Sequence, residues 1–453
     1  MTDISQSPAT APAAKPKNGS LFEKDARTKR RNAAEGRFKV YGIAAIGIGL
    51  LMLIVLVTNI VTAGLGAFQQ SFIELNVELR EDKLDKKGNR NIEDIKKVST
   101  FGYAPLIASA LENEVAELGI QTDLSPKDMG KILSKAAQAE LRNYVISNPD
   151  EIGKTVSFRF LVNSRVDGYM KGRVTRESIA NDKSITTEQL DFVDQLRDAG
   201  VLYKAFNPAF IFGADASDQR PEAAGIGVSM LGSLFMMFVV LVLALPIGVA
   251  ASIYLEEFAP QNRLTDIIEV NISNLAAVPS IVFGILGLAV FINYMHLPTS
   301  APLVGGLVLT LMTLPTIIIS TRASLKAVPP SIRDAALGVG ASKMQAVFHH
   351  VLPLAAPGIL TGTIIGLAQA LGETAPLLLI GMVGFIASNP PDGIVAGFLS
   401  PNSAMPAQIY EWSKRADPAF YERAWGGIII LLIFLVTMNT IAVLLRRRFE
   451  RRW

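Results

Sequence analysis

The chain has 453 residues, of which 50% are hydrophobic and 18% are charged, and its formal net charge is +3. This composition is too apolar for an ordinary soluble domain and too charged for a protein made only of membrane spans, so the two kinds of sequence should be segregated along the chain. The small net charge gives no field that would attract nucleic acid. Cysteine is absent and there are only three histidines, so we expect no disulfide, iron–sulfur cluster, metal site or other cofactor.

The N-terminal region, residues 1–39, is polar and carries a basic run around residues 24–31. We expect a disordered basic tail that ends at a membrane surface. Residues 40–67 are apolar and uncharged, and about 20 such residues are enough to cross the hydrocarbon core. A cleaved signal peptide is the alternative, but both the polar region and the apolar core are too long for one. We therefore predict an uncleaved first transmembrane helix.

Residues 68–225 are predicted to form one soluble α+β domain, long enough to have a core of its own. Alternating apolar residues predict strands, and amphipathic patterns predict helices. The expected strands are 71–80 and 155–162, and the expected helices are 105–118, 125–145 and 187–202. The carboxylates of this insert are interleaved with Lys and Arg, and no catalytic constellation is apparent. Packing or partner contacts are its expected role.

Five further apolar stretches follow, at residues 226–254, 273–295, 303–321, 355–386 and 425–445. All contain Gly or Pro, which transmembrane helices tolerate when neighbouring helices satisfy the freed backbone groups. The stretch 355–386 is longer than one crossing needs. It is predicted to break near Pro376 into a span and a re-entrant or interfacial piece.

The topology follows from the distribution of positive charge. Nine Lys and Arg residues precede the first span, and five follow the last, from Arg446 onward. Because such residues stay in the cytoplasm, both termini are predicted to be cytoplasmic, with a second basic tail at 447–453. Six spans meet this condition and also place loop 322–354 inside and residues 68–225 outside. The predicted fold is an all-α polytopic membrane protein, centred on residues 226–446, with a large extracytoplasmic α+β insert.

The loop between the fourth and fifth spans carries local helix signals. Ser331 precedes Asp334 by three residues and Ser342 precedes Gln345 by three, which is the spacing of a capping box. Pro353 is expected to stop the second helix. Two short helices joined by a sharp glycine turn are therefore predicted.

The first of these helices is predicted to expose Ala335 and Ala336. Side chains this small let another surface approach the backbone closely, as when a short helix lies in a partner's groove. An ordinary helical linker is equally compatible with the residues alone.

The loop resembles the signature of bacterial ATP-binding-cassette (ABC) importer permeases, which reads Glu-Ala-Ala, three residues, Gly, nine residues, Ile, one residue, Leu-Pro. The matching positions here are Asp334, Ala335, Ala336, Gly340, His350, Leu352 and Pro353. Asp for Glu preserves the charge, whereas His for Ile places a titratable group where the family has an aliphatic one. The resemblance implies a coupling helix that docks on an ABC ATPase subunit dimer.

The fifth predicted span combines small and polar residues. A stripe of small residues recurs at four-residue intervals, where another helix can pack closely: Gly358, Gly362, Gly366 and Ala370. Gln369 and Glu373 lie near the same face. An ionisable residue within a span indicates function unless it forms an ion pair that fixes packing.

The run from Leu371 to Pro376, together with residues 248–260 and 278–288, is similar to phosphate importer permeases of the PstA type. Sulfate and molybdate permeases resemble this region but usually have an aromatic residue where Thr374 stands. Many relatives have Arg where Gln369 stands, and no Lys or Arg falls inside a predicted span here.

The resemblance implies a translocation path that includes Gln369, Glu373, Thr374 and Arg322. The positive charge for an anion is expected from Arg322 at a span edge, from helix N-termini or from a partner permease. Glu373 is then expected to orient such an Arg rather than to touch substrate.

The expected function is that of a multi-pass permease in a bacterial inner membrane, which moves inorganic phosphate by alternating access. The chain has no Gly-x-x-x-x-Gly-Lys-[Ser/Thr] loop, so it is not expected to be an enzyme, and ATP hydrolysis falls to partner subunits. A second homologous permease, an extracytoplasmic phosphate-binding protein and membrane lipid are the other expected partners.

Three alternatives remain open at this point. The substrate could be another oxyanion, sulfate or molybdate. A secondary ion-coupled transporter needs a denser set of intramembrane ionisable groups than Glu373 alone, and it needs no docking loop. A membrane-anchored sensor needs a signalling domain, for which the tails are too short.

Overall fold

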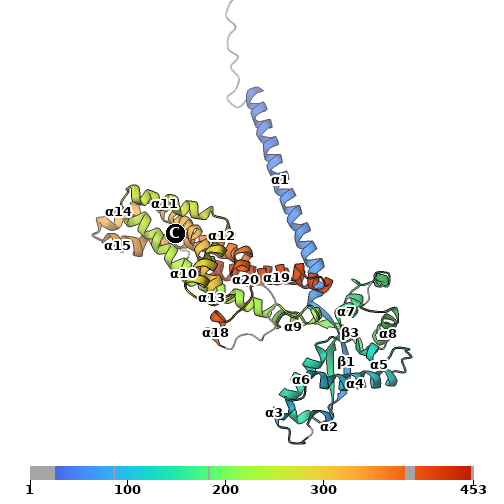
Figure 1. The fold of residues 1–453 in the computed structure, drawn as a ribbon. Coiled ribbons are helices and arrows are strands. Elements are labelled where there is room, and N and C mark those ends of the chain that lie inside the picture. The colour runs from blue at the N-terminus through green and yellow to red at the C-terminus, as the bar shows by residue number, and fades with distance from the viewer. Residues whose placement is uncertain (1–25, 86, 182–183, 383–392, 450–453) are drawn as a thin grey trace, which may run out of the picture. The chain divides into compact units, whose positions relative to one another are not determined.

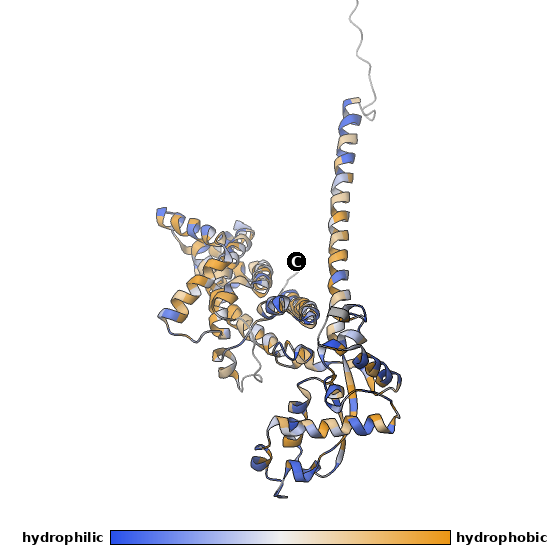
Figure 2. Cartoon of the chain, turned by 45° about the vertical axis from the view of Figure 1, so that its right-hand side comes forward, coloured by the Kyte–Doolittle hydropathy of each residue, from blue (hydrophilic) through white to orange (hydrophobic). Residues whose placement is uncertain are grey.

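The computed structural model describes residues 26–449, apart from 86, 182–183 and 383–392 (Figure 1). It divides into two units, residues 1–59 and 60–453. The first described element is helix α1, Ala26–Gly64, which is polar at its start and apolar along most of its length (Figure 2). Residues 26–39, expected to belong to a disordered tail, form the first turns of this helix. Their Ala, Arg, Lys and Glu residues are good helix formers, so the apolar helix extends backwards into the basic run.

The insert is built on a three-stranded antiparallel sheet in the order β2-β1-β3. Strand β1 is Gln69–Glu78, β2 is Thr155–Leu161 and β3 is Leu202–Phe206. The central strand β1 is mostly buried, and Ile73 pairs with Phe160 on one side and Leu202 on the other. These residues form one continuous core with the surrounding helices.

Among the described residues, eight short helices belong to the insert and its junction with the next span. They are α2 Glu81–Leu84, α3 Ile92–Ile95, α4 Ala104–Glu117, α5 Pro126–Gly130, α6 Ala137–Ser147, α7 Ser164–Met170, α8 Thr187–Asp198 and α9 Pro208–Phe212. Single 3₁₀ turns lie at 65–68, 100–103, 149–151, 178–181 and 221–223.

Two predicted helices of the insert differ from the structure. Helix 125–145 is split into α5 and α6 because the intervening segment joins the sheet edge: Leu133 bridges to Val162. Helix 187–202 ends earlier, where Gly200 takes a positive φ of 80°, a conformation that ends helices. The residues after it form the unpredicted strand β3.

Five described helices are long and apolar enough to cross a membrane. They are α1, α10 Gly227–Ile253, α13 Pro302–Lys326, α16 Leu352–Gly372 and α20 Pro418–Phe449. Helix α10 continues through a π-helical turn, Tyr254–Phe258. Predicted spans 40–67, 226–254, 303–321 and 425–445 each lie within one of these helices and its extensions.

The predicted span 273–295 is not one continuous helix. Its first residues belong to α11, Arg263–Ala276, and the rest to α12, Ser280–Gly287, which continues as a π-helical segment to Tyr294. The two parts are bent by 100°. Pro279 lies at the bend, and proline both lacks the amide hydrogen and disfavours helix in the residue before it. Counted as one broken span, this pair brings the number of candidate crossings to six.

The remaining helices lie at the two ends of the bundle. Helices α14, Pro330–Gly338, and α15, Lys343–Ala346, form the loop after α13 and lie together at one end (Figure 1). The predicted break in 355–386 is confirmed, because α16 ends before Glu373 and α17 is Ala375–Leu379; residues 383–386 lie outside the described residues. Two helices that the sequence did not predict precede α20, namely α18 Ile394–Leu399 and α19 Met405–Lys414.

Candidate functional site

The loop after α13 has the predicted pair of short helices, with one capping box of the two. The Gln345 amide donates to the Ser342 hydroxyl at 3.2 Å, and the Ser342 amide donates to the Gln345 side-chain oxygen at 2.9 Å. The box at Ser331 is absent because α14 starts one residue earlier, with Pro330 at its first position, where proline is favoured. Gly340, at a φ of 89°, makes the turn between the helices.

The second loop helix does not stop at Pro353. It passes through a π-helical turn, Val347–Val351, directly into α16, which begins at Leu352. A proline within the first turn of a helix removes an amide that has no partner there, and the wider π turn bridges the two segments. Leu352 and Pro353 therefore connect the loop rigidly to the fifth span.

The loop exposes both polar and large apolar side chains. Asp334 and Ala335 are exposed, whereas Ala336, predicted to be exposed, is buried against the chain that follows the turn. Four large apolar side chains of the loop are exposed as well: Leu337, Val339, Met344 and Phe348. Val339 is 86% exposed. Exposed apolar side chains are a common feature of protein-binding surfaces.

An arginine that the sequence analysis did not single out anchors the loop. Arg333 of α14 makes a bidentate ion pair with Glu257 at 2.6 Å, and the Glu257 side chain is only 6% exposed. The same guanidinium donates to the carbonyl oxygens of Leu325 and Val328 at 2.9 and 2.8 Å. The loop is thereby tied to the ends of both α10 and α13. Two adjacent carboxylates at the end of an apolar stretch, Glu256 and Glu257, are the only sequence signal for such an ion pair, and the sequence does not identify their partners.

Arg322, predicted to belong to the translocation path, pairs with carboxylates at the loop end of the bundle. Its guanidinium lies 2.6 Å from Glu269 of α11 and 3.3 Å from Glu256. Glu373 lies beyond the opposite end of α16. The structure therefore does not bring Arg322 and Glu373 together.

The stripe of small residues on α16 packs against α13, as the spacing predicts. Gly358 faces Ser324, and Gly362 faces Ser320 so closely that a Cβ atom at either glycine would collide with the serine side chain. Both hydroxyls donate to backbone carbonyls of α13 itself. The absence of side chains at the glycines thus lets the two helices approach, and α16 and α13 are held in antiparallel contact.

Glu373 and Thr374 form the break between α16 and α17. Glu373 is extended, with φ −75° and ψ 130°, and both residues are partly buried, while Gln369 is exposed. Past the break, α17 packs on α12, where Gly284 lies directly against the backbone of Pro376. Two interrupted helices, α11–α12 and α16–α17, therefore meet through their second halves.

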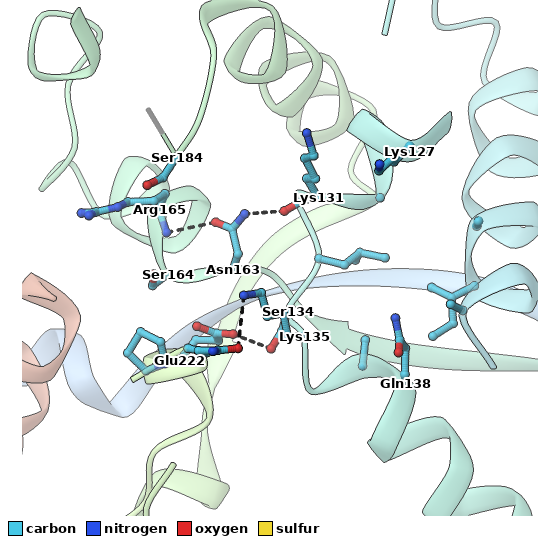
Figure 3. A pocket seen from close by; sticks show the side chains of 18 of the residues that line it. Lys127, Lys131, Ser134, Lys135, Gln138, Asn163, Ser164, Arg165, Ser184 and Glu222 are labelled. Carbon is cyan, nitrogen blue, oxygen red and sulfur yellow. Dashed lines mark hydrogen bonds between the residues drawn. The ribbon is translucent and has the colours of Figure 1, made fainter. Parts of the chain in front are cut away.

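The insert holds a polar pocket of about 790 Å³ (Figure 3). Basic side chains line it from several elements: Lys127, Lys131, Lys135 and Arg165. Figure 3 shows Asn163 between Lys131 and Arg165, donating to the first and accepting from the second. On the floor, the Ser134 hydroxyl donates to the Glu222 carboxylate at 2.5 Å. Three carboxylates line the pocket beside these basic side chains, those of Asp218, Glu222 and Asp417, so its lining carries both signs of charge.

A buried ionic cluster joins the insert to α20. Lys171 lies 2.7 Å from Asp167 and 2.8 Å from Glu422, and Arg173 pairs with the same two carboxylates. Next to it the buried Arg423 donates to the oxygens of Ala67 and Gln70, which follow α1, and of Glu222, which precedes α10. The sequence shows these charges as ordinary surface residues, and only the fold brings them together.

The same region predicts a dependence of stability on pH. Burial, with a smaller contribution from the Glu222 carboxylate, raises the pKa of Glu140 to about 7. Because the folded state then binds more protons than the unfolded state between about pH 4.5 and 7, stability should fall as the pH rises through this range. Glu140→Gln should stabilise the chain by about 1–3 kcal/mol at pH 8 and leave it unchanged at pH 4. Thermal denaturation of the full chain in detergent tests this, with the exposed Glu112→Gln as control; an equal gain at both pH values contradicts it.

Two family descriptions match the chain. Residues 244–453 match the binding-protein-dependent transport system inner membrane component, and residues 25–180 match a domain of unknown function, DUF3333. Among solved structures, an inward-facing form of the MetNI methionine ABC transporter is similar over 50% of this chain and 95% of its own, with 17% identity and a TM-score of 0.38.

Curated relatives match the permease half. The phosphate transport system permease protein PstA 1 of Mycobacterium tuberculosis (strain CDC 1551 / Oshkosh) is 31% identical over 51% of this chain and 73% of its own length. The probable ABC transporter permease protein YqgI of Bacillus subtilis (strain 168) is 32% identical over 52% of this chain and 82% of its own. The chain therefore belongs to the binding-protein-dependent ABC transporter permease family, as a permease of the PstA type.

Proposed function

We propose that this permease subunit translocates inorganic phosphate by alternating access, driven by a dimer of ABC ATPase subunits. Several relatives are named phosphate transport system permeases. The observation that carries the proposal is the helix break at Glu373 and Thr374, packed on a second interrupted helix. Discontinuous helices of this kind form substrate sites in many transporters.

The depth of the break supports this assignment. Arg446, at the end of α20, donates to Thr361 of α16 at 2.9 Å, and such basic residues mark the cytoplasmic edge of a span. Glu373 lies twelve residues further along, about 18 Å at 1.5 Å per residue. Since the hydrocarbon core is about 30 Å thick, the break falls near its middle.

Coupling is proposed to run through the loop 322–354. The loop lies on the proposed cytoplasmic side, it exposes Asp334, Ala335 and several large apolar side chains, and Arg333 ties it to α10 and α13. Closure of the ATPase dimer then moves the loop and the spans together and opens the path to alternate sides. A second related permease completes the path, an extracytoplasmic binding protein delivers phosphate, and both termini lie in the cytoplasm of a bacterial inner membrane.

Glu373→Gln tests the translocation site. The carboxylate is partly buried at the break, and no partner for it is found among the described residues. We expect the carboxylate to orient a cationic side chain, for example an Arg of the partner permease. A charge-assisted hydrogen bond contributes about 1.5–3 kcal/mol, so its removal should lower uptake at least about tenfold. Proteoliposomes containing the whole complex give the readout, with exposed Asp266→Asn as control. Unchanged uptake and ATP hydrolysis would show that Glu373 has no part in transport.

Substrate and docking are tested separately. Uptake of labelled phosphate should be suppressed by unlabelled phosphate and far less by sulfate or molybdate; the reverse order assigns another oxyanion.

A pull-down of the ATPase subunit should be lost on deletion of 331–345. Val339→Asp, at a side chain that packs on little of this chain, should weaken the pull-down without harm to folding. Retention of the ATPase by both variants excludes the loop as the docking element.

A further inference from the structure

An apolar cavity of about 330 Å³ lies between α10, α16 and α20. Thirteen of its fifteen lining side chains are aliphatic or methionine, and the two others are Thr363 and Asn439. The Thr363 hydroxyl already donates to the carbonyl of Ile359 at 2.9 Å. A cavity with such walls does not hold water well and suits a hydrocarbon chain.

The length of the cavity matches one leaflet of a bilayer. It follows α16 from Leu360 to Leu371 and α20 from Leu435 to Leu445. Eleven residues of helix correspond to about 16 Å, and half of a hydrocarbon core of about 30 Å is about 15 Å. One acyl chain of a membrane lipid therefore fits its long dimension.

A basic residue with an unused donor stands where the cavity ends. Arg446 follows the lining residue Leu445, and its guanidinium donates to Thr361, which follows the lining residue Leu360. The Nε atom of Arg446 is buried, and no hydrogen-bond partner for it exists among the described residues. The next residue, Arg447, is exposed. A buried donor without a partner is costly, and a phosphate oxygen satisfies a guanidinium well.

We propose that this cavity and Arg446 together bind one anionic phospholipid, with an acyl chain between the three helices and the head-group phosphate on Arg446. Basic pockets between transmembrane helices recognise lipid head groups in this way. The head group then lies in the cytoplasmic leaflet, and only this part of the proposal rests on the proposed topology. The lipid connects α16, which leads to Glu373, with α20, whose first turns contact the insert through Glu422.

Native mass spectrometry of the full chain, released from membranes that contain equal amounts of phosphatidylglycerol and phosphatidylcholine, tests the head-group contact. The wild type should retain one phosphatidylglycerol per chain in preference to phosphatidylcholine. Arg446→Gln should reduce this preference about fivefold, the factor that corresponds to about 1 kcal/mol per basic residue near a lipid surface. The exposed neighbour Arg447→Gln serves as the matched control and should retain most of the preference.

A second variant tests the cavity without touching the charge. Ala442 lines the cavity, so Ala442→Leu should fill part of it and lower retention of both lipids. Leu444→Ala, at a side chain 58% exposed and outside the lining, should leave retention unchanged. Equal retention by the wild type, Arg446→Gln and Ala442→Leu overturns the proposal.

Two further outcomes assign the cavity to another occupant. Displacement of the bound species by inorganic phosphate alone shows that Arg446 binds the free anion and not a lipid. Because the chain has no cysteine, a cysteine pair placed at 442 and on α1 can be cross-linked specifically. Cross-linking in full yield, with no lipid retained, shows that α1 fills the cavity and also overturns the proposal.

Discussion

Arg333→Gln is expected to abolish coupled transport while leaving the spans in place. The wild-type guanidinium pairs with the buried Glu257 and with two backbone carbonyls. Glutamine cannot replace this fork, so Glu257 keeps a buried charge without a partner, at a cost of about 3–5 kcal/mol. The loop then loses its ionic attachment to the end of α10. In proteoliposomes with the whole complex, uptake should fall by a factor of about 100 or more, and ATP hydrolysis should no longer respond to substrate.

Three comparison variants separate the anchor from general loss of charge. Lys326→Gln removes a basic residue of the same region that is 61% exposed and lies 3.6 Å from Glu256, and surface pairs contribute little, so uptake should stay near the wild-type level. Arg333→Lys keeps the charge but not the bidentate geometry and should be intermediate. Arg333→Met with Glu257→Met should restore stability, because both buried charges are gone, yet not coupling. Full uptake by Arg333→Gln contradicts the anchor.

Lys171→Met is expected to destabilise the junction between the insert and α20. Lys171 is only 8% exposed and lies between Asp167 and Glu422. Its removal leaves two buried carboxylates with fewer cations, which costs about 3–5 kcal/mol. Unfolding should change the fluorescence of Trp412, which is fully buried and whose indole NH donates to Asp215 at 2.8 Å. Thermal denaturation of the purified full chain measures it.

The junction prediction has its own controls. Lys204→Gln changes an exposed lysine of β3 and should shift the melting temperature little. Lys171→Met combined with Glu422→Gln removes one charge of each sign and should recover part of the lost stability. If Lys171→Met melts like the wild type, the cluster does not hold the insert to α20. If it melts earlier but transports normally, the insert is a passive attachment.

The junction also bears on what the insert can do. Arg423 holds Ala67, just before β1, and Gln70, within β1, and the cluster around Lys171 holds the end of α7 to the start of α20. A partner bound at the insert therefore acts on the end of a span without an intervening flexible linker. This arrangement gives the insert a mechanical connection to the permease helices, which a tethered domain would lack.

Most spans and the loop helices were predictable because their signals are local. A run of apolar residues long enough to cross a bilayer specifies a span wherever it packs, and the capping box at Ser342 is complete within four residues. The small-residue stripe on α16 was predictable for the same reason, since four-residue spacing alone places Gly358 and Gly362 on one face. The break before Pro376 follows from the proline itself.

The failures also have physical causes. The apolar run around Pro279 predicts one span, because hydropathy does not distinguish a straight helix from a bent one. Pro353 predicts the end of the second loop helix, although a proline in the first turn of a following helix is compatible with continuation. Helix 125–145 had a helical pattern, but pairing of Leu133 with Val162 prevailed over local propensity.

The sequence by itself determined which stretches are long and apolar enough to span a membrane, where the loop helices fall along the chain and which family the permease half resembles. Hydrophobic length and motif spacing are properties of neighbouring residues and need no contact across the chain. Only the tertiary structure decided which charges meet: Arg333 with Glu257, Lys171 with Glu422, and Arg322 with carboxylates rather than with Glu373. The partners in these pairs are far apart in sequence, and packing of whole helices sets their distance.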